Sequence, residues 1–200
     1  MMKTLSQKIL SYATQQPEGA LLQASALGNM GSRNAIDQAL SRLAKRGQLL
    51  RAGRGVYVLP VQNRFGARAP EASKVIGCIA EQSGETIVPS EAAAANALGL
   101  TTQVPVRQTY LTSGHSRHLK LGAQVVELKK APAWKLRLPN RPAGQALRAL
   151  AWAGERNVHT VANTLKKQLS GTELTALSGV STRYMPAWIA NELRCLSAYG

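Results

Sequence analysis

The sequence has few of the residues on which several classes of protein depend. Only 10 of its 200 residues are acidic, only two are cysteines, and Asp37 is the only aspartate. So few carboxylates leave little material for a metal-dependent or acid–base active site. Two cysteines far apart in the chain cannot form a disulfide framework. We therefore expect no enzyme activity, no bound metal and no cofactor, and we expect Cys78 and Cys195 to be buried free thiols.

Long hydrophobic runs are also missing. No stretch of 18 apolar residues occurs, so the sequence predicts no transmembrane helix. The first residues, MMKTLSQKILSYATQQPEG, lack the apolar core and the small-residue cleavage site of a signal peptide. We expect a cytoplasmic protein that does not bind membranes.

Positive charge is what the sequence has in excess. Lysine and arginine number 25, which gives a formal net charge of +15. Residues 1–65 hold nine basic and two acidic residues, and residues 66–200 hold sixteen and eight. Both parts are thus strongly basic, and we expect a polyanionic partner.

The most informative stretch begins with a predicted helix after Ser32, whose hydroxyl suits a helix N-cap. Ile36, Leu40 and Leu43 recur at helical spacing and predict one buried face, and Gly47 suits the end. The remaining polar side chains can contact bases or phosphates. Together with Ser32, the candidate DNA-binding residues on this helix are Arg33, Asn34, Asp37, Gln38, Ser41, Arg42 and Lys45.

A basic hairpin is predicted directly after this helix. Residues 48–51 and 56–59 can pair as strands around a glycine-rich tip, where Arg51 and Arg54 add two further DNA-binding candidates. Residues 5–13 and 21–27 predict two helices upstream. This order is typical of a winged helix-turn-helix, in which a helix enters the major groove and the hairpin holds the backbone. A protein-docking module is the alternative.

The rest of the chain predicts a second domain. Residues 61–70, between Pro60 and Pro70, show no periodicity, which is typical of a linker between a DNA-binding domain at 1–60 and a domain at 71–200. Helices are expected after Pro70 and Ser90, strands over 86–88, 106–112 and 123–128, and then a helical tail. The predicted fold class is α+β: an N-terminal winged helix-turn-helix followed by a C-terminal α+β domain with a small sheet and a helical tail.

A second basic surface is a further hypothesis. Between residues 117 and 141, Glu127 is the only acid beside seven cations, so an anionic partner would relieve their repulsion. A purely solvated surface explains the same charges equally well. The candidates are Arg117, Lys120, Lys129, Lys130, Lys135 and Arg137, the first two in an expected basic loop with His115 and His118.

One nuclease-like pattern competes with these binding hypotheses. Glu127-Leu128-Lys129 has the E-x-K spacing of restriction-type nucleases, but Glu91 or Glu85 would have to complete the metal site. His115 and His118 lack a third zinc ligand nearby. A metal-dependent nuclease is therefore the least favoured reading.

Several segments together resemble a known family. The helix SRNAIDQALSRL, the hairpin RAGRGVY, the segment 109–114 (TYLTSG) with Ser116-Arg117, and the segment 144–150 (GQALRAL) are similar to AbiEi-type antitoxins of type IV toxin–antitoxin systems. The likeness spans nearly the whole chain. Its most particular part is the TYLTSG segment with the basic strand after it.

The resemblance implies a protein with two roles. The N-terminal domain would bind inverted repeats in its own promoter as double-stranded DNA and repress the operon. The C-terminal domain would counter a nucleotidyltransferase-like toxin, with direct contact left open. The protein would be a monomer or weak dimer that assembles on DNA. A plain winged-helix transcription regulator without antitoxin activity is the alternative.

Overall fold

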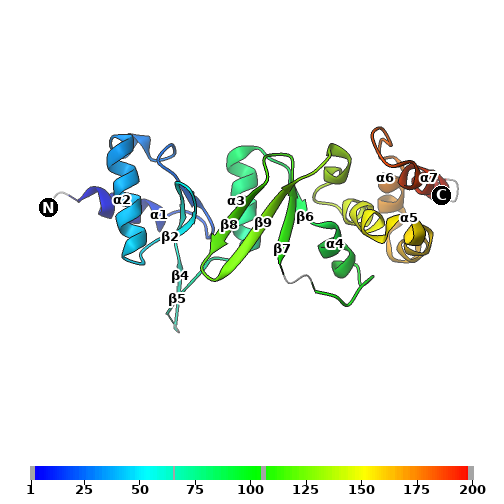
Figure 1. Cartoon of the computed structure of the whole chain (residues 1–200), viewed down its shortest axis with the longest axis horizontal. Coiled ribbons are helices and arrows are strands. Elements are labelled where there is room, and N and C mark those ends of the chain that lie inside the picture. Colours follow the sequence, from blue (N-terminus) through cyan, green and yellow to red (C-terminus); the bar gives the residue numbers. More distant parts are fainter. Residues whose placement is uncertain (1–2, 65, 105–106, 198–200) are drawn as a thin grey trace. The chain divides into compact units, whose positions relative to one another are not determined.

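The computed structural model describes residues 3–64, 66–104 and 107–197, and it combines helices with small sheets, as an α+β fold does (Figure 1). The chain divides into two compact units. Unit 1 comprises Met1–Glu85 and Arg117–Glu127, and unit 2 comprises Thr86–Ser116 and Leu128–Gly200. Each unit is described by itself below.

The first part of unit 1 has three helical elements and three strands. In chain order they are α1 (Leu5–Ala13), β1 (Leu21–Leu22), the 3-10 helix η1 (Gly28–Met30), α2 (Arg33–Lys45), β2 (Leu50–Gly53) and β3 (Val56–Val58). The strands form an antiparallel sheet in the order β1-β3-β2. Helix α1 carries a complete capping box, in which Thr4 and Gln7 satisfy each other's backbone N–H groups.

One core joins these elements. Ile9 of α1, Leu27 and the α2 residues Ile36 and Leu40 are all fully buried. Burial of a side chain of this size contributes about 1.5–3 kcal/mol. The predicted apolar face of α2 is thus confirmed, and so is its end, because Gly47 adopts the left-handed conformation (φ 72°).

The prediction of a helix over residues 21–27 is wrong. Leu21 and Leu22 instead pair with Val58 and Tyr57 as strand β1, and both leucines are buried. Turns and η1 fill the remaining path to α2. Two adjacent leucines can both be buried in a paired strand within a core, and this long-range pairing outweighs a short local helical preference.

Residues 61–70 are structured rather than a plain linker. Strands β4 (Val61–Asn63) and β5 (Gly66–Arg68) pair antiparallel, and helix α3 (Ala72–Ser83) follows within unit 1. Glu18 explains why α3 belongs here, since its carboxylate accepts a hydrogen bond from the Glu71 backbone N–H (3.1 Å) and another from Lys74. The expected boundary near residue 60 therefore differs from the division into compact units.

Four further strands form a sheet in the order β6-β7-β9-β8 (Figure 1). They are β6 (Ile87–Pro89), β7 (Gln108–Thr112), β8 (Arg117–Leu121) and β9 (Gln124–Lys130). Strands β6, β7 and β9 were predicted, although Val106, the expected start of β7, lies outside the described residues. Strand β8 corrects the expected basic loop: Leu119 and Leu121 are buried while His118 and Lys120 are exposed, the alternation of a strand with one buried face.

Helices make up most of unit 2. They are α4 (Glu91–Ala97), the 3-10 helix η2 (Ala133–Leu136), α5 (Pro142–Gln168), α6 (Gly171–Ser178) and α7 (Ala187–Ser197). Ser90 caps α4 as predicted, by accepting a hydrogen bond from the Ala93 N–H. Helix α5 is broken at Gly154, and its residues Leu147, Leu150 and Leu165 lie at the centre of the core.

The cysteines differ in part from the expectation. Cys78 is half-buried, and burial raises the pKa of its thiol, whereas Cys195 is exposed. Cys195 lies on the polar side of α7, beside the buried Leu196. Both are free thiols.

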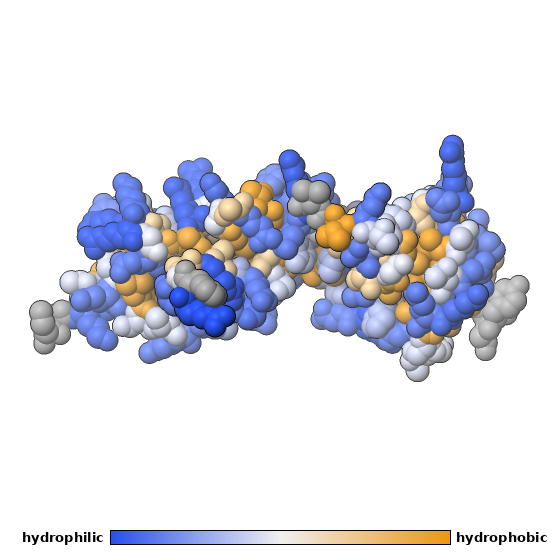
Figure 2. All heavy atoms as spheres, turned by 90° about the horizontal axis from the view of Figure 1, so that it is seen from below, coloured by the Kyte–Doolittle hydropathy of each residue, from blue (hydrophilic) through white to orange (hydrophobic). Residues whose placement is uncertain are grey.

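Among the described residues no helix is long and apolar enough to span a membrane. The face seen in Figure 2 is mostly hydrophilic with separate hydrophobic patches.

Candidate nucleic-acid interface

Helix α2 presents a continuous polar face. Its apolar residues Ile36, Ala39, Leu40 and Leu43 are buried, so the rest of the helix surface faces outward. The candidate residues Arg33, Asn34, Asp37, Gln38, Arg42 and Lys45 are all exposed, and Ser41 is half-buried. The structure thus brings the predicted side chains of this helix onto one accessible surface.

Local hydrogen bonds orient part of this face. Ser32 accepts a hydrogen bond from the Ala35 N–H (3.4 Å) and so serves as the N-cap. Arg42 donates to the Gln38 side-chain oxygen over 2.9 Å, one helical turn away. That bond holds the two exposed side chains together along the helix and uses the Gln38 oxygen, so its NH2 group is the donor that Gln38 can offer to a ligand. A Gln–Arg pair of this kind can contact acceptors on base edges or phosphates.

The β2–β3 hairpin carries the two arginines that were predicted for it. Gly55 adopts a positive φ (69°), which lets the chain turn tightly beside Arg54. Arg51 donates from Nε to the Gly53 carbonyl (3.3 Å), so its side chain follows the hairpin toward the tip. Both arginines are exposed. The hairpin therefore supplies positive charge at a rigid turn.

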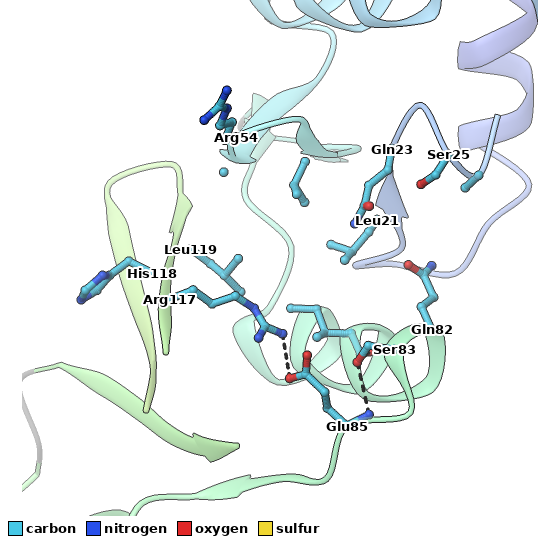
Figure 3. A pocket seen from close by; sticks show the side chains of 14 residues that line it. Leu21, Gln23, Ser25, Arg54, Gln82, Ser83, Glu85, Arg117, His118 and Leu119 are labelled. Carbon is cyan, nitrogen blue, oxygen red and sulfur yellow. Dashed lines mark hydrogen bonds and ion pairs between the residues drawn. The ribbon is translucent and has the colours of Figure 1, made fainter. Parts of the chain in front are cut away.

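A cavity of about 700 Å³ lies beside this hairpin in unit 1 (Figure 3). The tip residue Arg54, the end of α3 near Ser83, and strand β8 line it. Within it Arg117 forms an ion pair with Glu85 (2.9 Å), and His118 points to the other side of the strand. Local sequence patterns could not predict that β8 lies beside the hairpin, because Val58 at the end of β3 and Arg117 at the start of β8 are 59 positions apart.

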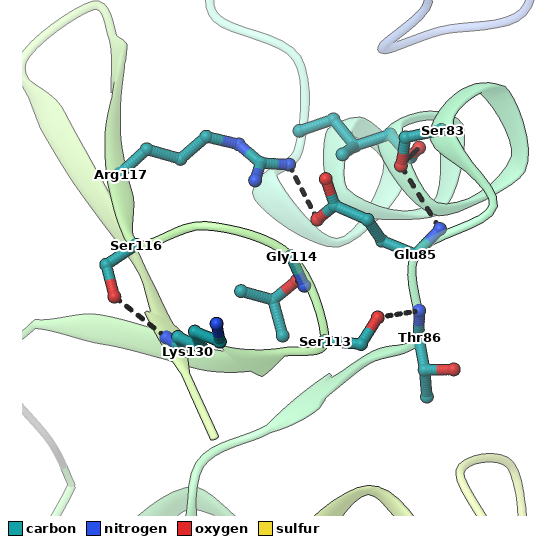
Figure 4. A network of polar contacts seen from close by, with 10 residues as sticks. Ser83, Glu85, Thr86, Ser113, Gly114, Ser116, Arg117 and Lys130 are labelled. Carbon is teal, nitrogen blue, oxygen red and sulfur yellow. Dashed lines mark hydrogen bonds and ion pairs between the residues drawn. The ribbon is translucent and has the colours of Figure 1, made fainter. Parts of the chain in front are cut away.

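Serine side chains accept hydrogen bonds from backbone N–H groups at or next to the ends of strands β6 and β9 (Figure 4). The Ser83 hydroxyl accepts a hydrogen bond from the Glu85 N–H (3.2 Å) in unit 1. In unit 2, Ser113 accepts from the Thr86 N–H (3.0 Å) and Ser116 from the Lys130 N–H (2.9 Å). Ser113 of the TYLTSG segment and Ser116 just after it thus satisfy backbone N–H groups of neighbouring chain segments.

The prediction of the second basic surface was wrong about which acids its cations meet. Its cations do not face Glu127 alone, because acids from distant parts of the chain reach them. Arg117 pairs with Glu85, and Lys135 pairs with Glu91. Arg141, also in that stretch, pairs with Glu173 over 2.8 Å. The remaining candidates Lys120, Lys129, Lys130 and Arg137 are exposed, the first in unit 1 and the others in unit 2.

The acids required for a nuclease site are engaged elsewhere. Glu85 and Glu91, the two possible partners of Glu127, each form an ion pair with a cation. Glu127 itself lies 3.6 Å from His118. Among the described residues no three His, Cys, Asp or Glu side chains gather as metal ligands.

Arg148 is a buried residue that the sequence did not reveal. It lies on α5 with its side chain fully buried, and it donates to the Lys135 carbonyl (3.4 Å). Its Nε and Nη2 atoms have no partner among the described residues. Burial lowers its pKa to about 10, against a smaller opposing effect of Glu91. In the sequence Arg148 looks like one more surface cation.

Comparisons with known proteins give a family and a fold. The model of a family of unknown function, DUF6088, matches residues 8–174. No curated protein matches. The crystal structure of the RV2827C protein from Mycobacterium tuberculosis is similar, with a TM-score of 0.53 over 98% of this chain and 77% of that chain, at 16% sequence identity. At that identity the likeness bears on the fold alone.

Proposed function

This chain belongs to the family of unknown function DUF6088, and from its structure we propose that it binds duplex DNA with α2 in the major groove and the β2–β3 hairpin on the adjacent backbone. The observation that carries the proposal is the exposed polar face of α2, which is followed directly by the arginine-bearing hairpin.

The topology of unit 1 supports a winged helix. In that fold a helix and a short strand precede the recognition helix, and a hairpin follows it. Helix α1, strand β1, helix α2 and strands β2 and β3 occur in this order, and β3 lies between β1 and β2. We infer a winged helix-turn-helix in which turns and η1 replace the middle helix.

The charges of α2 also favour DNA. Arg33, Lys45 and Arg46 are exposed and form no ion pair with any described residue, and Asp37 is the one acid on the helix. Cations that no acid neutralises attract phosphates and release counterions on binding. A protein-docking face would more often carry exposed apolar anchors, and the outward residues of α2 are polar or charged.

Binding to the DNA upstream of the chain's own gene tests this proposal. We expect the full-length protein to shift this duplex at moderate salt more strongly than a random duplex of equal length, and to protect a defined footprint. Equal affinity for both duplexes at every salt concentration would contradict sequence-specific binding.

Single substitutions separate base contacts from phosphate contacts. Arg33→Ala or Gln38→Ala should reduce the preference for the specific duplex by about 1–3 kcal/mol. Arg54→Ala should weaken all duplexes similarly and reduce the salt dependence of binding. Arg156→Ala, at an exposed position of α5, is the matched control. Equal losses on specific and random DNA for all three α2 and hairpin variants would refute this division.

The same proposal extends to regulation in the cell. We propose that the protein represses its own operon, as the similarity to AbiEi-type antitoxins implies, and that unit 2 opposes the toxin encoded beside it. Segments 109–114 and 144–150, which carry that similarity, lie in β7 with its following turn and in α5. A transcription regulator without antitoxin activity is the alternative.

A growth experiment distinguishes the two roles. A variant with Arg33, Gln38 and Arg54 all replaced by alanine should lose repression of a promoter reporter. If unit 2 carries an antitoxin activity, the same variant, expressed from a foreign promoter, should still rescue cells from the neighbouring toxin. Failure of the wild-type chain to rescue would leave the plain regulator.

A further inference from the structure

A second cavity, of about 480 Å³, lies within unit 2. We name it the arginine cradle and define it by five of the residues that line it: Trp134, Arg137, Ser181, Arg183 and Tyr184. Pockets for small molecules have volumes of about 300–1,000 Å³. The cradle is therefore large enough for a ligand of that class.

The cations of the cradle are not neutralised. Arg137 and Arg183 are exposed, and neither guanidinium forms an ion pair with any described residue. Lys135 and Arg141, close to them in the sequence, are each held by a glutamate. The residues that line the cradle include no acid. Two such arginines at one cavity make a binding place for an anion, and guanidinium groups match phosphate geometry well.

Aromatic rings accompany these cations. Trp134 is 7% exposed and forms a rigid part of the wall, with the Lys135 ammonium 5.4 Å from its ring centre. Tyr184 is 81% exposed, and the Arg183 guanidinium lies 4.8 Å from its ring centre. An exposed tyrosine beside an oriented arginine is a surface on which a planar base can stack.

The backbone is strained on both sides of the cradle, at Tyr184 beside Arg183 and at Leu138 beside Arg137. Tyr184 occupies the third position of a turn closed by the Met185 N–H and the Thr182 carbonyl, and its φ is 65°. Glycine or asparagine fits that position at lower cost. Leu138, next to Arg137, has a φ of 49°. Strain of this kind concentrates where a side chain must be presented in one direction.

Gly144 of α5 holds the Arg137 wall in place. A Cβ added at Gly144 would meet the Leu138 carbonyl oxygen at 1.9 Å and the Arg137 oxygen at 2.9 Å. Only a glycine lets the backbone of residues 137–138 lie this close to the helix. The backbone position from which the Arg137 side chain extends is therefore set by packing against α5.

We propose that the arginine cradle binds a nucleotide, with its phosphate between Arg137 and Arg183 and its base on the ring of Tyr184. The nucleotide can be free in solution or can be one unit of a single strand. This site is distinct from the α2 face and does not depend on duplex DNA binding.

Calorimetric titration of the full-length protein tests the proposal with four probes: AMP, adenosine, inorganic phosphate and a single-stranded RNA hexamer. We expect AMP or the hexamer to bind at least tenfold more tightly than phosphate or adenosine. Binding of AMP identifies the free nucleotide, and binding of the hexamer alone identifies a strand. No binding of either at millimolar concentration would overturn the proposal, as would equal binding of phosphate.

Matched variants assign the binding to the cradle. Arg137→Gln and Arg183→Gln should each weaken binding about tenfold, a loss of about 1.4 kcal/mol. Arg156→Gln, an exposed arginine on α5, should change it less than twofold. An equal loss in Arg156→Gln would mean that net charge alone attracts the ligand, against the proposal.

Tyr184→Gly removes the ring while it relieves the strained turn. We expect this variant to melt at a higher temperature than the wild type and to bind the nucleotide at least fivefold more weakly. Tyr184→Phe should retain most of the affinity, because it keeps the ring. Undiminished binding by Tyr184→Gly would refute stacking on this residue. Arg183→Gln should also leave the footprint on promoter DNA unchanged, so failure of this proposal and failure of DNA binding are distinguishable.

Discussion

Units 1 and 2 have similar charge and place it in different ways. Unit 1 contains 13 basic and six acidic residues, and unit 2 contains 12 and four. Unit 1 displays cations along the outer face of one helix, where a long polyanion can lie. Unit 2 pairs Lys135 and Arg141 with glutamates, buries Arg148 and leaves Arg137 and Arg183 around a cavity. Nearly equal net charge, +7 and +8, therefore suits different proposed partners, depending on the surface that carries it.

The two units share one way of fixing a helix. Helices α3 and α5 lack a capping side chain next to them in sequence, and each is capped by a distant glutamate. In unit 1 Glu18 accepts from the Glu71 N–H and from Lys74. In unit 2 Glu173 accepts from the Ala143 N–H (2.8 Å) and from Arg141. Negative charge at a helix N-terminus is favourable, so each carboxylate stabilises a helix and a tertiary contact together.

The largest effect should come from the close contact within unit 2. Gly144→Ala places a Cβ against the Leu138 carbonyl oxygen, and we expect it to lower the free energy of unfolding by more than about 3 kcal/mol. Gly171→Ala is the control, because nothing lies within 4 Å of a Cβ at that position. Urea unfolding measures both. Similar stability of the two variants would show that residues 137–138 do not rest on α5.

A substitution at Gly19, the close contact of unit 1 with α3, should destabilise the protein somewhat less than Gly144→Ala does. Gly19 has a φ of 91°, and a Cβ there would lie 2.7 Å from the Val75 nitrogen of α3. We expect Gly19→Ala to destabilise the protein by about 2–3 kcal/mol, from strain and from displacement of α3. Gly77→Ala, on α3 itself with open space around it, should be neutral or slightly stabilising. If both variants were equally stable, α3 would not be fixed by residues 18–19.

The buried cation of unit 2 should be dispensable for stability. Arg148→Met should raise the free energy of unfolding by about 1–2 kcal/mol at pH 7, because it removes a buried charge two of whose nitrogens have no partner among the described residues. The sign follows from a pKa lowered to about 10 in the folded protein. Below about pH 10 the full free-energy penalty of burying the charge opposes folding. Above that pH the folded protein releases the proton, and the penalty decreases.

Denaturant unfolding at pH 7, 9 and 10.5 therefore measures both the gain in the free energy of unfolding of this variant and how that gain depends on pH. We expect the gap between Arg148→Met and the wild type to stay constant from pH 7 to 9 and to narrow at pH 10.5. Arg156→Met, at an exposed position of the same helix, controls for the loss of one positive charge. Destabilisation by Arg148→Met would show that this guanidinium has a partner that stabilises the fold.

The smallest effects should appear on acidification. Hydrogen bonds from Lys74 and the Glu71 N–H lower the pKa of Glu18, and those from Arg141 and the Ala143 N–H lower the pKa of Glu173. The two ionised carboxylates contribute fully to the free energy of unfolding above the ordinary glutamate pKa of 4.5. This contribution is lost as the pH falls through their lowered pKa values. Glu18→Gln and Glu173→Gln should each reduce the loss of melting temperature between pH 6 and 3.

A matched control sharpens this experiment. Glu81→Gln removes an exposed carboxylate of α3 that accepts no hydrogen bond from a helix N-terminus among the described residues. It should melt with nearly the same dependence on pH as the wild type. If Glu18→Gln and Glu173→Gln behaved as this control does, the two distant caps would not contribute to stability.

Local sequence patterns predicted the element that carries the candidate site. Ser32 and Ser90 cap their helices as expected, Gly47 and Gly84 end theirs, and the apolar face of α2 is buried. Each of these signals acts over one or two helical turns and can therefore be read from neighbouring residues. The exposed or half-buried candidates on α2 follow from the helical periodicity, Arg51 and Arg54 from the glycine-rich hairpin pattern, and Ser32 from its capping hydroxyl.

Long-range relations were missed for the opposite reason. Strand β1 forms because Leu21 and Leu22 pair with residues of β3, and β8 lies beside a hairpin far away in the sequence. The expected isolation of the cations after residue 117 was wrong, because Glu85, Glu91 and Glu173 approach only after folding. None of these acids is near its partner in the sequence.

By itself, the sequence determined the excess of positive charge, the limits of α2 and which of its faces is polar, since these depend on composition and on hydrogen bonds between near neighbours. Only the tertiary structure decided which cations are paired, that Arg148 is buried, and that Arg137, Arg183 and two aromatic rings surround one cavity. The physical reason is that charge pairing and desolvation depend on distances in space, and folding brings together residues as far apart in the chain as Glu18 and Lys74, which are 56 positions apart.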